Sequence, residues 1–311
     1  MEAKAGRYSI GRTTARRSGL LQFRRESDYR YERAKAFGDY RSQKKIKRKF
    51  YAAGKNLFII NKNEFPGGLH AFMKTETLNF DTAKGATTAY VAMPDEMNDE
   101  TKAVLIIQEY WGLNDHIKDI TNRYADEGFI AIAPDLYRGR IAESSEEASK
   151  MMQSLELEDG LDTIKNAITT AQEKYGMAKF GITGFCMGGT YALQSACKLE
   201  GLGASAPFYG DVPDEFTLQG LKCPVLFISA TKDQWINTEK VGELERIAKA
   251  NVLPVESVKY EADHAFFNDT RPEVYDREAA KDAWAKVIAF FNENLTIVKP
   301  ELNKINTDDI F

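Results

Sequence analysis

The twelve residues from Lys179 to Thr190, KFGITGFCMGGT, decide the fold that we predict for this chain. Their apolar start is typical of a buried strand, and apolar side chains recur at helical spacing in the residues that follow. Between the two parts, Gly184 and Gly188 flank Cys186. A strand, a tight turn between glycines and a helix form a nucleophile elbow, whose strained tip leaves no room for side chains on its neighbours. The stretch predicts such an elbow with Cys186 at its tip, although plain α/β packing would also produce a strand, a glycine turn and a helix.

Length and composition indicate an ordinary globular protein. The chain has 311 residues, of which 43% are hydrophobic and 28% charged, enough for one large α/β domain or two smaller ones. No apolar run approaches the roughly 20 residues that span a bilayer, and no signal-peptide core occurs near the start. The three cysteines show no CxxC spacing, which indicates neither a disulfide framework nor a zinc site. We expect a cytoplasmic protein in a reducing compartment.

Charge divides the chain into two unlike parts. Residues 1–55 contain 17 Lys and Arg against 5 Asp and Glu, whereas the whole chain contains 42 and 46. Residues 1–72 show no sustained helical or strand period, and we expect a basic, disordered extension. This extension is an arm for nucleic acid or an anionic surface, an organellar transit segment, or a stretch upstream of a true start at Met73. We favour the third interpretation, because MKTETLNF opens like a first strand.

Residues 73–311 have the pattern of a single α/β domain. Two β-prone segments at 75–80 and 87–93, with Lys84 and Gly85 near the turn, predict an antiparallel hairpin. Further strands are expected at 104–107, 129–133, 180–182, 204–209, 224–230 and 255–260. Helices are expected at 116–127, 159–175 and 277–295. Three more helices should follow a capping box at Ser144, the elbow and a cap at Thr238. Strands that alternate with helices predict a mainly parallel sheet with helices on both faces.

Four strand ends carry side chains that suggest chemistry. They are Glu109, Cys186, Asp233 and His264, and strand ends at the carboxyl edge of an open α/β sheet are where working residues gather. The order nucleophile, acid, histidine is that of the α/β-hydrolases. Each residue alone has an ordinary explanation, such as a buried cysteine or a structural histidine. However, the chain has only three histidines, and one of them falls at the triad position.

These residue types fit nucleophilic catalysis by a thiol. A free thiol is mostly protonated at neutral pH, so Cys186 needs a base, which His264 can supply while Asp233 orients its ring. The backbone N–H groups of Met187 and Tyr110 are the candidate oxyanion hole. No metal-ligand spacing occurs and no P-loop follows the glycines, so we expect neither a metal nor a cofactor.

With these residues in place, the chain resembles the dienelactone hydrolase family (carboxymethylenebutenolidases) within the α/β-hydrolases. The matching stretches are QEYWGLNDHIKDITNRYADEGFIAIAPDLY, GFCMGG, SATKDQ and DHAFF, and the resemblance covers about residues 73–295. It implies that the cysteine attacks an enol-lactone carbonyl and that water releases the acid from an acyl-enzyme. It also implies that Glu109 contacts the resting thiol and takes part in its activation. A carboxylate there would keep the thiol protonated at rest.

Two positions depart from the family's pattern. The family's dienelactone enzymes hold the substrate carboxylate with arginines. Here Arg138 and Arg140 flank the corresponding first position without matching its register. At the second position stands Asn268, with Arg271 a little further on.

The resulting prediction is a hydrolase of small lactones or esters that uses a Cys-His-Asp triad. Candidate pocket walls are Trp111, Tyr137 and Phe266, each of which is also explained as an ordinary core aromatic. The alternatives are a carboxylesterase or thioesterase acting on another small ester, and a non-catalytic scaffold with a basic binding arm. We expect a small-molecule substrate, no membrane partner, nucleic acid only through residues 1–72, and a monomer or small homo-oligomer.

Overall fold

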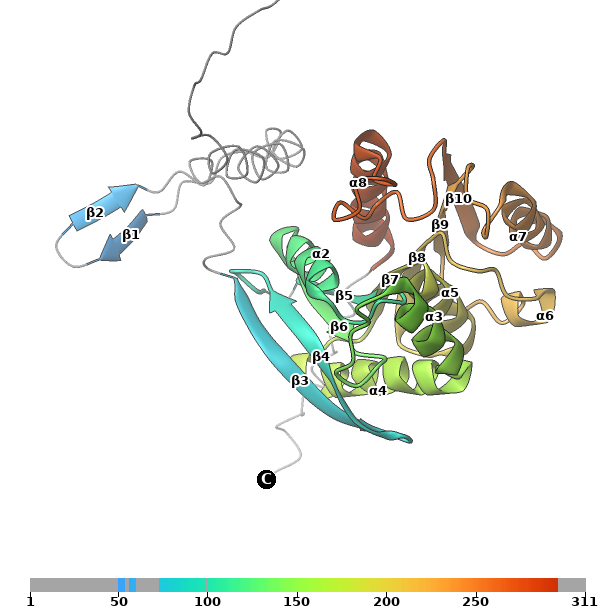
Figure 1. Ribbon diagram of the computed structural model, residues 1–311. Coiled ribbons are helices and arrows are strands. Elements are labelled where there is room, and N and C mark those ends of the chain that lie inside the picture. Colours follow the sequence, from blue (N-terminus) through green and yellow to red (C-terminus); the bar gives the residue numbers. More distant parts are fainter. Residues whose placement is uncertain (1–49, 54–55, 60–72, 99, 296–311) are drawn as a thin grey trace, which may run out of the picture. The chain divides into compact units, whose positions relative to one another are not determined.

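The computed structural model describes residues 50–53, 56–59, 73–98 and 100–295 (Figure 1). The chain divides into two compact units, residues 1–69 and 70–311. In the first unit, β1 (Phe50–Ala53) and β2 (Asn56–Ile59) pair as an antiparallel hairpin that the sequence pattern did not predict. The prediction of disorder for residues 1–72 lies otherwise outside the described residues.

The second unit is built on an eight-stranded sheet with the order β10-β9-β8-β7-β5-β6-β4-β3. The strands are β3 (Lys74–Thr82), β4 (Gly85–Met93), β5 (Lys102–Ile107), β6 (Phe129–Pro134), β7 (Phe180–Phe185), β8 (Leu202–Phe208), β9 (Val225–Ala230) and β10 (Val255–Tyr260). The six strands from β10 to β6 run parallel. The antiparallel pairs of this sheet are β4 with β6 and β3 with β4, and the β3–β4 pair confirms the predicted hairpin at the start of the domain.

Helices cover both faces of this sheet (Figure 1). They are α2 (Asp115–Asp126), α3 (Ser145–Ser154), α4 (Leu157–Tyr175), α5 (Met187–Lys198), α6 (Glu215–Leu218), α7 (Thr238–Ala250) and α8 (Arg277–Asn294). Helices α2 and α8 pack on one face, and α4, α5 and α7 pack on the other. The predicted α/β fold is confirmed, and within residues 73–295 only the four-residue α6 was missed, since one turn is too short to show a period.

Strand β5 shows how the sequence builds a sheet with two covered faces. Leu105 and Ile107 belong to the core under α4 and α5, whereas Val104 and Ile106 belong to the core under α2 and α8. All four side chains are fully buried. An uninterrupted apolar run is therefore required here, because neither face of the strand meets water.

Helix capping agrees with the sequence at one helix and differs at another. The Ser144 side chain accepts a hydrogen bond from the backbone N–H of Glu147, as a capping box predicts. For α7 the prediction of a Thr238 cap is wrong. The Asn237 side chain caps this helix by accepting from the N–H of Lys240 at 3.0 Å. Asparagine is the stronger cap of two adjacent candidates, so the helix begins one residue earlier.

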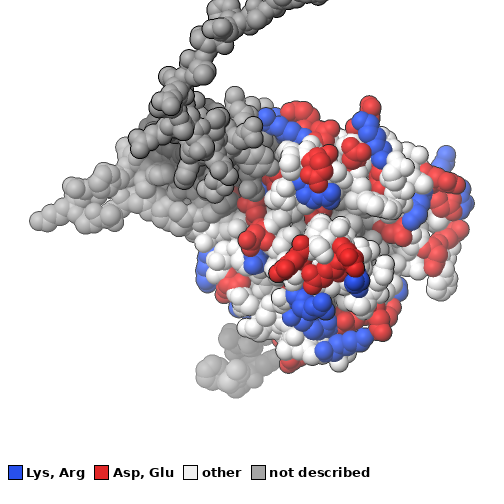
Figure 2. Space-filling model, in the orientation of Figure 1, with Lys and Arg blue, Asp and Glu red and all other residues white. Residues whose placement is uncertain are grey.

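The described surface mixes both signs of charge. Figure 2 shows basic and acidic side chains interspersed on the visible face of this unit. Exposed ion pairs include Lys240 with Asp211 and Lys222 with Glu200, at 2.6 and 2.7 Å. No helix in the described part of the chain is long and apolar enough to cross a membrane.

Candidate active site

The elbow after β7 has the strained geometry that its glycines predict. Cys186 lies between β7 and α5 with φ 56° and ψ −117°. A non-glycine residue in such a conformation costs about 1–3 kcal/mol and persists only when its surroundings enforce it. The surroundings here are the end of a fully buried strand and the first turn of a helix that is buried along its inner side.

Two glycines allow the backbone segments of the elbow to touch. A Cβ atom on Gly184 would lie 2.1 Å from the carbonyl oxygen of Gly188. A Cβ atom on Gly188 would lie 2.2 Å from the carbonyl oxygen of Ile107, at the end of β5. Real Cβ atoms essentially never approach so closely, so only glycine fits either position. This contact brings the first turn of α5, and Cys186 with it, against the end of β5.

The four residues singled out at strand ends meet at one edge of the sheet. Glu109 follows β5, Cys186 follows β7, Asp233 follows β9 and His264 follows β10. All of these strands are parallel, so their carboxyl ends lie at the same edge. Strands β5 and β7 are neighbours at the point where the chain order reverses, which is where open α/β sheets bind ligands.

Asp233 and His264 form a hydrogen-bonded pair in which the carboxyl is fully buried and the imidazole is partly buried. The Nδ1 atom of His264 lies 2.5 Å from Oδ2 of Asp233. The other oxygen, Oδ1, accepts the backbone N–H groups of Trp235 and Ile236 at 2.8 and 3.0 Å. Burial raises the pKa of Asp233, but the hydrogen bond and charge of His264 and the two N–H groups outweigh it, so the net pKa is lowered. An ionised aspartate favours the tautomer of His264 that carries its proton on Nδ1. The other ring nitrogen, Nε2, is buried and has no hydrogen-bond partner among the residues that the structure describes.

The thiol of Cys186 is protonated at rest. Burial and then the negative charge of Glu109 raise its pKa to about 12. The backbone N–H of Met187, which hydrogen-bonds the sulfur, and the positive charge of Arg271 act in the opposite direction. An isolated thiol at this position would be inert at neutral pH, so nucleophilic chemistry requires a base beside it.

Glu109 is a buried acid that titrates near neutrality. Its side chain accepts a hydrogen bond from Nδ2 of Asn268 at 2.7 Å. Burial raises its pKa to about 7, while the Asn268 hydrogen bond and the charges of Arg271 and His264 hold it below the value that burial alone would produce. A carboxyl that changes charge near pH 7 beside a thiol is typical of a functional site.

Two aromatic residues beside the histidine were missed by the sequence analysis. The ring centroid of Tyr209 lies 5.0 Å from that of His264, and the Trp235 ring meets His264 edge-on at 4.9 Å. Tyr209 is fully buried, whereas Trp235 is 70% exposed. The signal was present in the sequence, because Tyr209 directly follows β8 and Trp235 lies two residues after Asp233.

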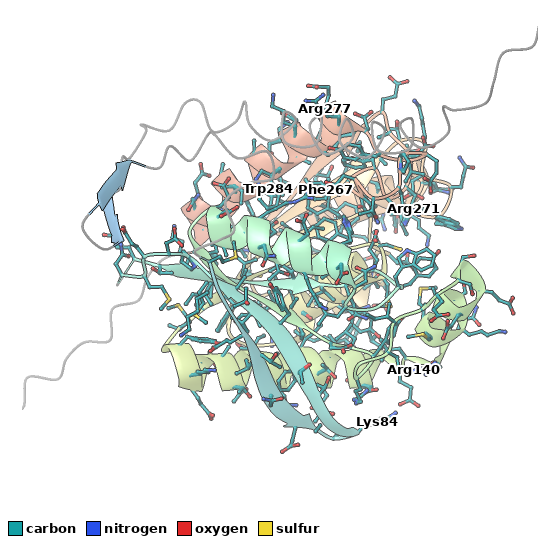
Figure 3. The ribbon with its side chains drawn as sticks, turned by 60° about the vertical axis from the view of Figure 1, so that its left-hand side comes forward. Lys84, Arg140, Phe267, Arg271, Arg277 and Trp284 are labelled. Atoms are coloured by element: carbon teal, nitrogen blue, oxygen red, sulfur yellow. The ribbon has the colours of Figure 1, made fainter. Side chains whose placement is uncertain are left out.

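The predicted pocket walls fall in different places. The Tyr137 hydroxyl donates to Sδ of Met187 at 3.2 Å, which puts this ring at the elbow. Trp111 is partly buried and packs edge-on against Tyr110 at 4.7 Å. Phe266 is fully buried in the core under α8, where its ring packs on Tyr209 and Tyr260. Its neighbour Phe267 stacks on Trp284 of α8 (Figure 3).

Of the predicted arginines, the structure brings only Arg271 into electrostatic reach of the thiol. Arg138 is bound by Asp159 through both terminal nitrogens, at 2.5 and 3.1 Å. Arg140 is exposed, and Figure 3 shows it well apart from Arg271. Arg271 donates from Nε to Glu273 at 2.8 Å, and its charge lowers the pKa values of both Glu109 and Cys186.

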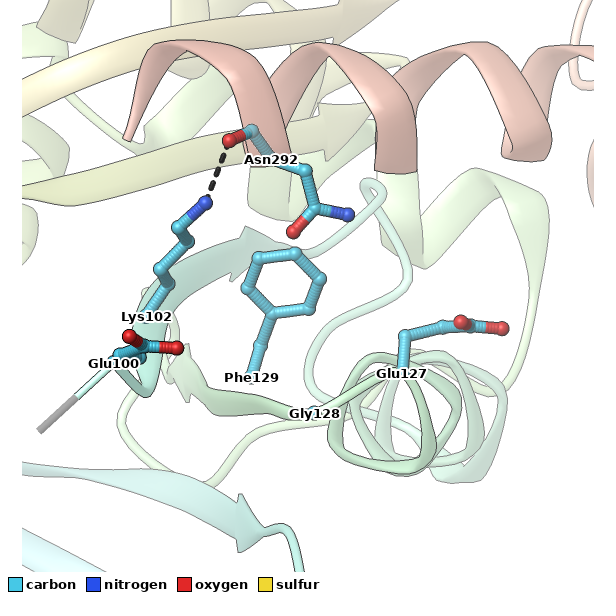
Figure 4. Close-up of a pocket in the computed structure, with 6 residues that line it drawn as sticks. All are labelled: Glu100, Lys102, Glu127, Gly128, Phe129 and Asn292. Atoms are coloured by element: carbon cyan, nitrogen blue, oxygen red, sulfur yellow. Dashed lines mark hydrogen bonds between the residues drawn. The ribbon is translucent and has the colours of Figure 1, made fainter. Parts of the chain in front are cut away.

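A separate shallow pocket lies at the opposite edge of the sheet, where β5 and β6 begin (Figure 4). Its lining residues are Glu100, Lys102, Glu127, Gly128, Phe129 and Asn292. The Lys102 ammonium is occupied by the carbonyl oxygen of Asn292 at 2.6 Å. This pocket has neither a nucleophile nor a histidine, and it is not the candidate site.

The sheet order, the helices on both faces and the cysteine-tipped elbow define an α/β-hydrolase. Residues 87–295 match the family model described as the Dienelactone hydrolase family. Because this match covers more than half of the chain, the chain belongs to the dienelactone hydrolase family, and it is a hydrolase of carboxylic esters or lactones. The resemblance noted in the sequence is confirmed.

Individual relatives agree with this assignment. "Protein usf" of Aquifex pyrophilus is 38% identical over 207 residues, which cover 62% of this chain and 88% of the relative. The "Putative carboxymethylenebutenolidase" of Aquifex aeolicus is 36% identical over 206 residues, with the same coverage of 62% and 88%. A crystal structure described as "Putative Dienelactone Hydrolase" from Klebsiella pneumoniae is 28% identical, with a TM-score of 0.66, and the match covers 70% of this chain and 98% of that one.

Proposed function

We propose that the protein hydrolyses a small lactone or ester through a covalent intermediate on Cys186. His264 serves as the base and Asp233 orients it. The observation that carries this proposal is the hydrogen-bonded His264–Asp233 pair at 2.5 Å, which lies at the same sheet edge as the elbow cysteine. The Nε2 atom of His264 is buried and has no hydrogen-bond partner within the described part of the chain. A reducing, cytoplasmic location is part of the proposal and agrees with three free cysteines.

The proposed reaction has two halves. Nε2 of His264 takes the thiol proton, and the Cys186 sulfur attacks the carbonyl carbon of the substrate. The tetrahedral intermediate then expels the alcohol oxygen, which receives the proton from His264, and a thioester remains on Cys186. In a lactone this oxygen stays attached to the acyl chain, so the ring opens. His264 next deprotonates water, which attacks the thioester and releases the acid and the free thiol.

The oxyanion of both tetrahedral intermediates is assigned to two backbone N–H groups. That of Met187 opens α5 and already hydrogen-bonds the resting sulfur, which supports its direction toward the reacting atoms. That of Tyr110 follows Glu109 at the end of the adjacent strand. Removing one such donor from an oxyanion hole typically lowers kcat by about 100- to 1000-fold.

Two substrate classes remain within this proposal. Arg271 is the cation available for a substrate carboxylate, as a dienelactone would present, with Trp111, Tyr137 and Trp235 as apolar contacts. An ester without a carboxylate is the second candidate. It is favoured by the pairing of Arg138 with Asp159 and by the neutral residue Asn268 at the family's second arginine position.

The test compares hydrolysis of a dienelactone and of 4-nitrophenyl acetate by the wild-type protein and by Cys186→Ala. We expect the substitution to lower the rate by about 10³-fold or more, because it removes the covalent route. Arg271→Gln serves as the matched probe of charge recognition. It should raise KM for the dienelactone and leave KM for the neutral acetate unchanged if a carboxylate is bound.

Wild-type turnover of the acetate alone would retain the cysteine mechanism and exclude dienelactone as a substrate. Turnover of either substrate that survives in Cys186→Ala would overturn the proposed nucleophile.

A further inference from the structure

Asn268 occupies an unusual position for a loop residue, because it reaches the buried acid of the site. It lies in the loop after β10, four residues beyond His264, and is only 3% exposed. Its Nδ2 donates to Oε2 of Glu109 at 2.7 Å, across 159 residues of sequence. Hydrogen bonds to the charged form of a buried carboxyl are among the strongest influences on whether it ionises.

The orientation of this amide is determined by Thr270. The backbone N–H and the hydroxyl of Thr270 both donate to Oδ1 of Asn268, at 3.1 and 2.6 Å. An amide oxygen accepts but cannot donate, so these two bonds identify the oxygen and turn the NH₂ group toward Glu109. The loop itself is held by further backbone bonds, from Asn268 N–H to Ala265 at 2.9 Å and from Arg271 N–H to Asn268 at 3.1 Å.

We propose that Asn268, with its amide oriented by Thr270, is a positioning residue that holds the Glu109 carboxylate in its ionised form beside the Cys186 thiol. This inference rests on the function proposed above, in which that thiol is the nucleophile. Asn268 itself touches no reacting atom in the proposed mechanism, and its effect on the thiol passes through Glu109.

The physical reason lies in the kind of donor that meets the carboxylate. A neutral N–H stabilises the negative charge of Glu109 without cancelling it, whereas a guanidinium would both stabilise and neutralise it. The uncancelled charge therefore acts on the sulfur and raises the pKa of Cys186, second only to burial. Asn268 thus favours a protonated thiol in the resting enzyme.

The ionisation of Glu109 is sensitive to its surroundings, because several ionisable groups lie close to it. Besides Cys186, the groups that interact electrostatically with Glu109 are Tyr110, Tyr209, His264 and Arg271. The pKa of Glu109 is about 7, so its charge changes within the physiological range. Loss of the Asn268 donor moves that change to higher pH.

The experiment measures the pH dependence of Cys186 alkylation by iodoacetamide, a neutral reagent that requires no substrate. Full-length protein is used, with Cys186→Ser as the blank for Cys197 and Cys223. In the wild type, the rise of the rate with pH should flatten near pH 7, where Glu109 ionises and opposes thiolate formation. In Asn268→Leu the flattening should move up by about one pH unit or more, as expected from loss of one hydrogen bond to a charged group.

Two controls distinguish positioning from structural damage. Thr270→Val, on the exposed side of the loop, should shift the flattening in the same direction by a smaller amount, and Thr270→Ser should restore the wild-type profile. In a Glu109→Gln background, Asn268→Leu should leave the pH profile unchanged, because Asn268 acts only through Glu109.

An unchanged flattening in both Asn268→Leu and Thr270→Val would overturn the inference, as would a shift that persists in the Glu109→Gln background. If Asn268→Leu does not fold, the two Thr270 variants decide the outcome alone. Alkylation and ester hydrolysis are separate readouts. If the profile shifts but the protein hydrolyses neither test ester, the proposed substrates are refuted and the role of Asn268 is supported. If hydrolysis depends on Cys186 but the profile does not shift, the proposed function is supported and the role of Asn268 is refuted.

Discussion

Glu109 is the residue whose placement works against the stability of the fold. Its carboxyl is buried, and burial raises its pKa to about 7 from the usual value of 4.5. Between these two pH values the unfolded chain releases a proton that the folded chain retains, so the free energy of unfolding falls as pH rises through this window. Above pH 7 both states are ionised and the loss is complete. Such a penalty at a functional site is the usual exchange of stability for activity.

Glu109→Gln should therefore stabilise the protein in a pH-dependent way. The glutamine oxygen can still accept from Asn268, but the side chain no longer ionises. Relative to the wild type, the gain in free energy of unfolding should be near zero at pH 4.5 and reach about 3 kcal/mol above pH 7. Urea unfolding at several pH values measures it. A difference that stays constant with pH would contradict the raised pKa.

At the scale of elements, the turn after α7 places a β-branched residue, Val252, in a backbone conformation that favours glycine. Val252 has φ 54°, in the left-handed region, and is 89% exposed. The N–H of Leu253 closes the helix by donating to Ala248 at 2.9 Å, so Val252 occupies the position where helices usually place glycine. A β-branched residue there is strained, and its exposed side chain gains little from packing.

Val252→Gly should stabilise the protein by about 1 kcal/mol. The left-handed conformation costs an L-residue about 1–2 kcal/mol, and glycine avoids this cost. Part of the gain is offset because glycine loses more conformational entropy on folding than valine does. The melting temperature should then rise by about 2–4 °C. Gly176→Ala is the matched control. Gly176 ends α4 at φ 70° with open space around its missing Cβ, and this substitution should lower stability by a similar amount. Equal melting temperatures for Val252→Gly and the wild type would refute the strain.

At the scale of the whole molecule, we propose that the catalytic domain lies within residues 73–311 and does not need residues 1–72 for its activity. The compact second unit begins at residue 70, and the family match spans residues 87–295. All the residues of the proposed site lie within it. The strongly basic residues 1–55 lie outside it and have no role in the proposed chemistry.

A chain that starts at Met73 should hydrolyse the same test ester with an unchanged kcat/KM and unfold in one cooperative transition. Retention on a heparin column, compared between the full-length and shortened chains, tests the binding-arm interpretation. Elution of both at the same salt concentration would remove its support. A large loss of activity on truncation would show instead that residues 1–72 belong to the enzyme.

Much of this protein could be read from local sequence. Every strand and helix predicted for residues 73–295 is present, because buried strands need apolar runs and helices need their own spacing and caps. The elbow was recognised from Gly184 and Gly188, whose close contacts exclude any side chain. The strand-end positions of Glu109, Asp233 and His264 followed from the same local logic.

The pairing of side chains is what the sequence alone left open. The sequence by itself determined the class of fold, the nucleophile candidate and the set of acids and bases around that nucleophile. Only the tertiary structure decided that Asn268 binds Glu109, that Arg138 is held by Asp159 and that Tyr209 packs on His264. The physical reason is range. Apolar periodicity and turn chemistry act between near neighbours in the chain, whereas these contacts join residues up to 159 positions apart and depend on the order in which the strands lie in the sheet.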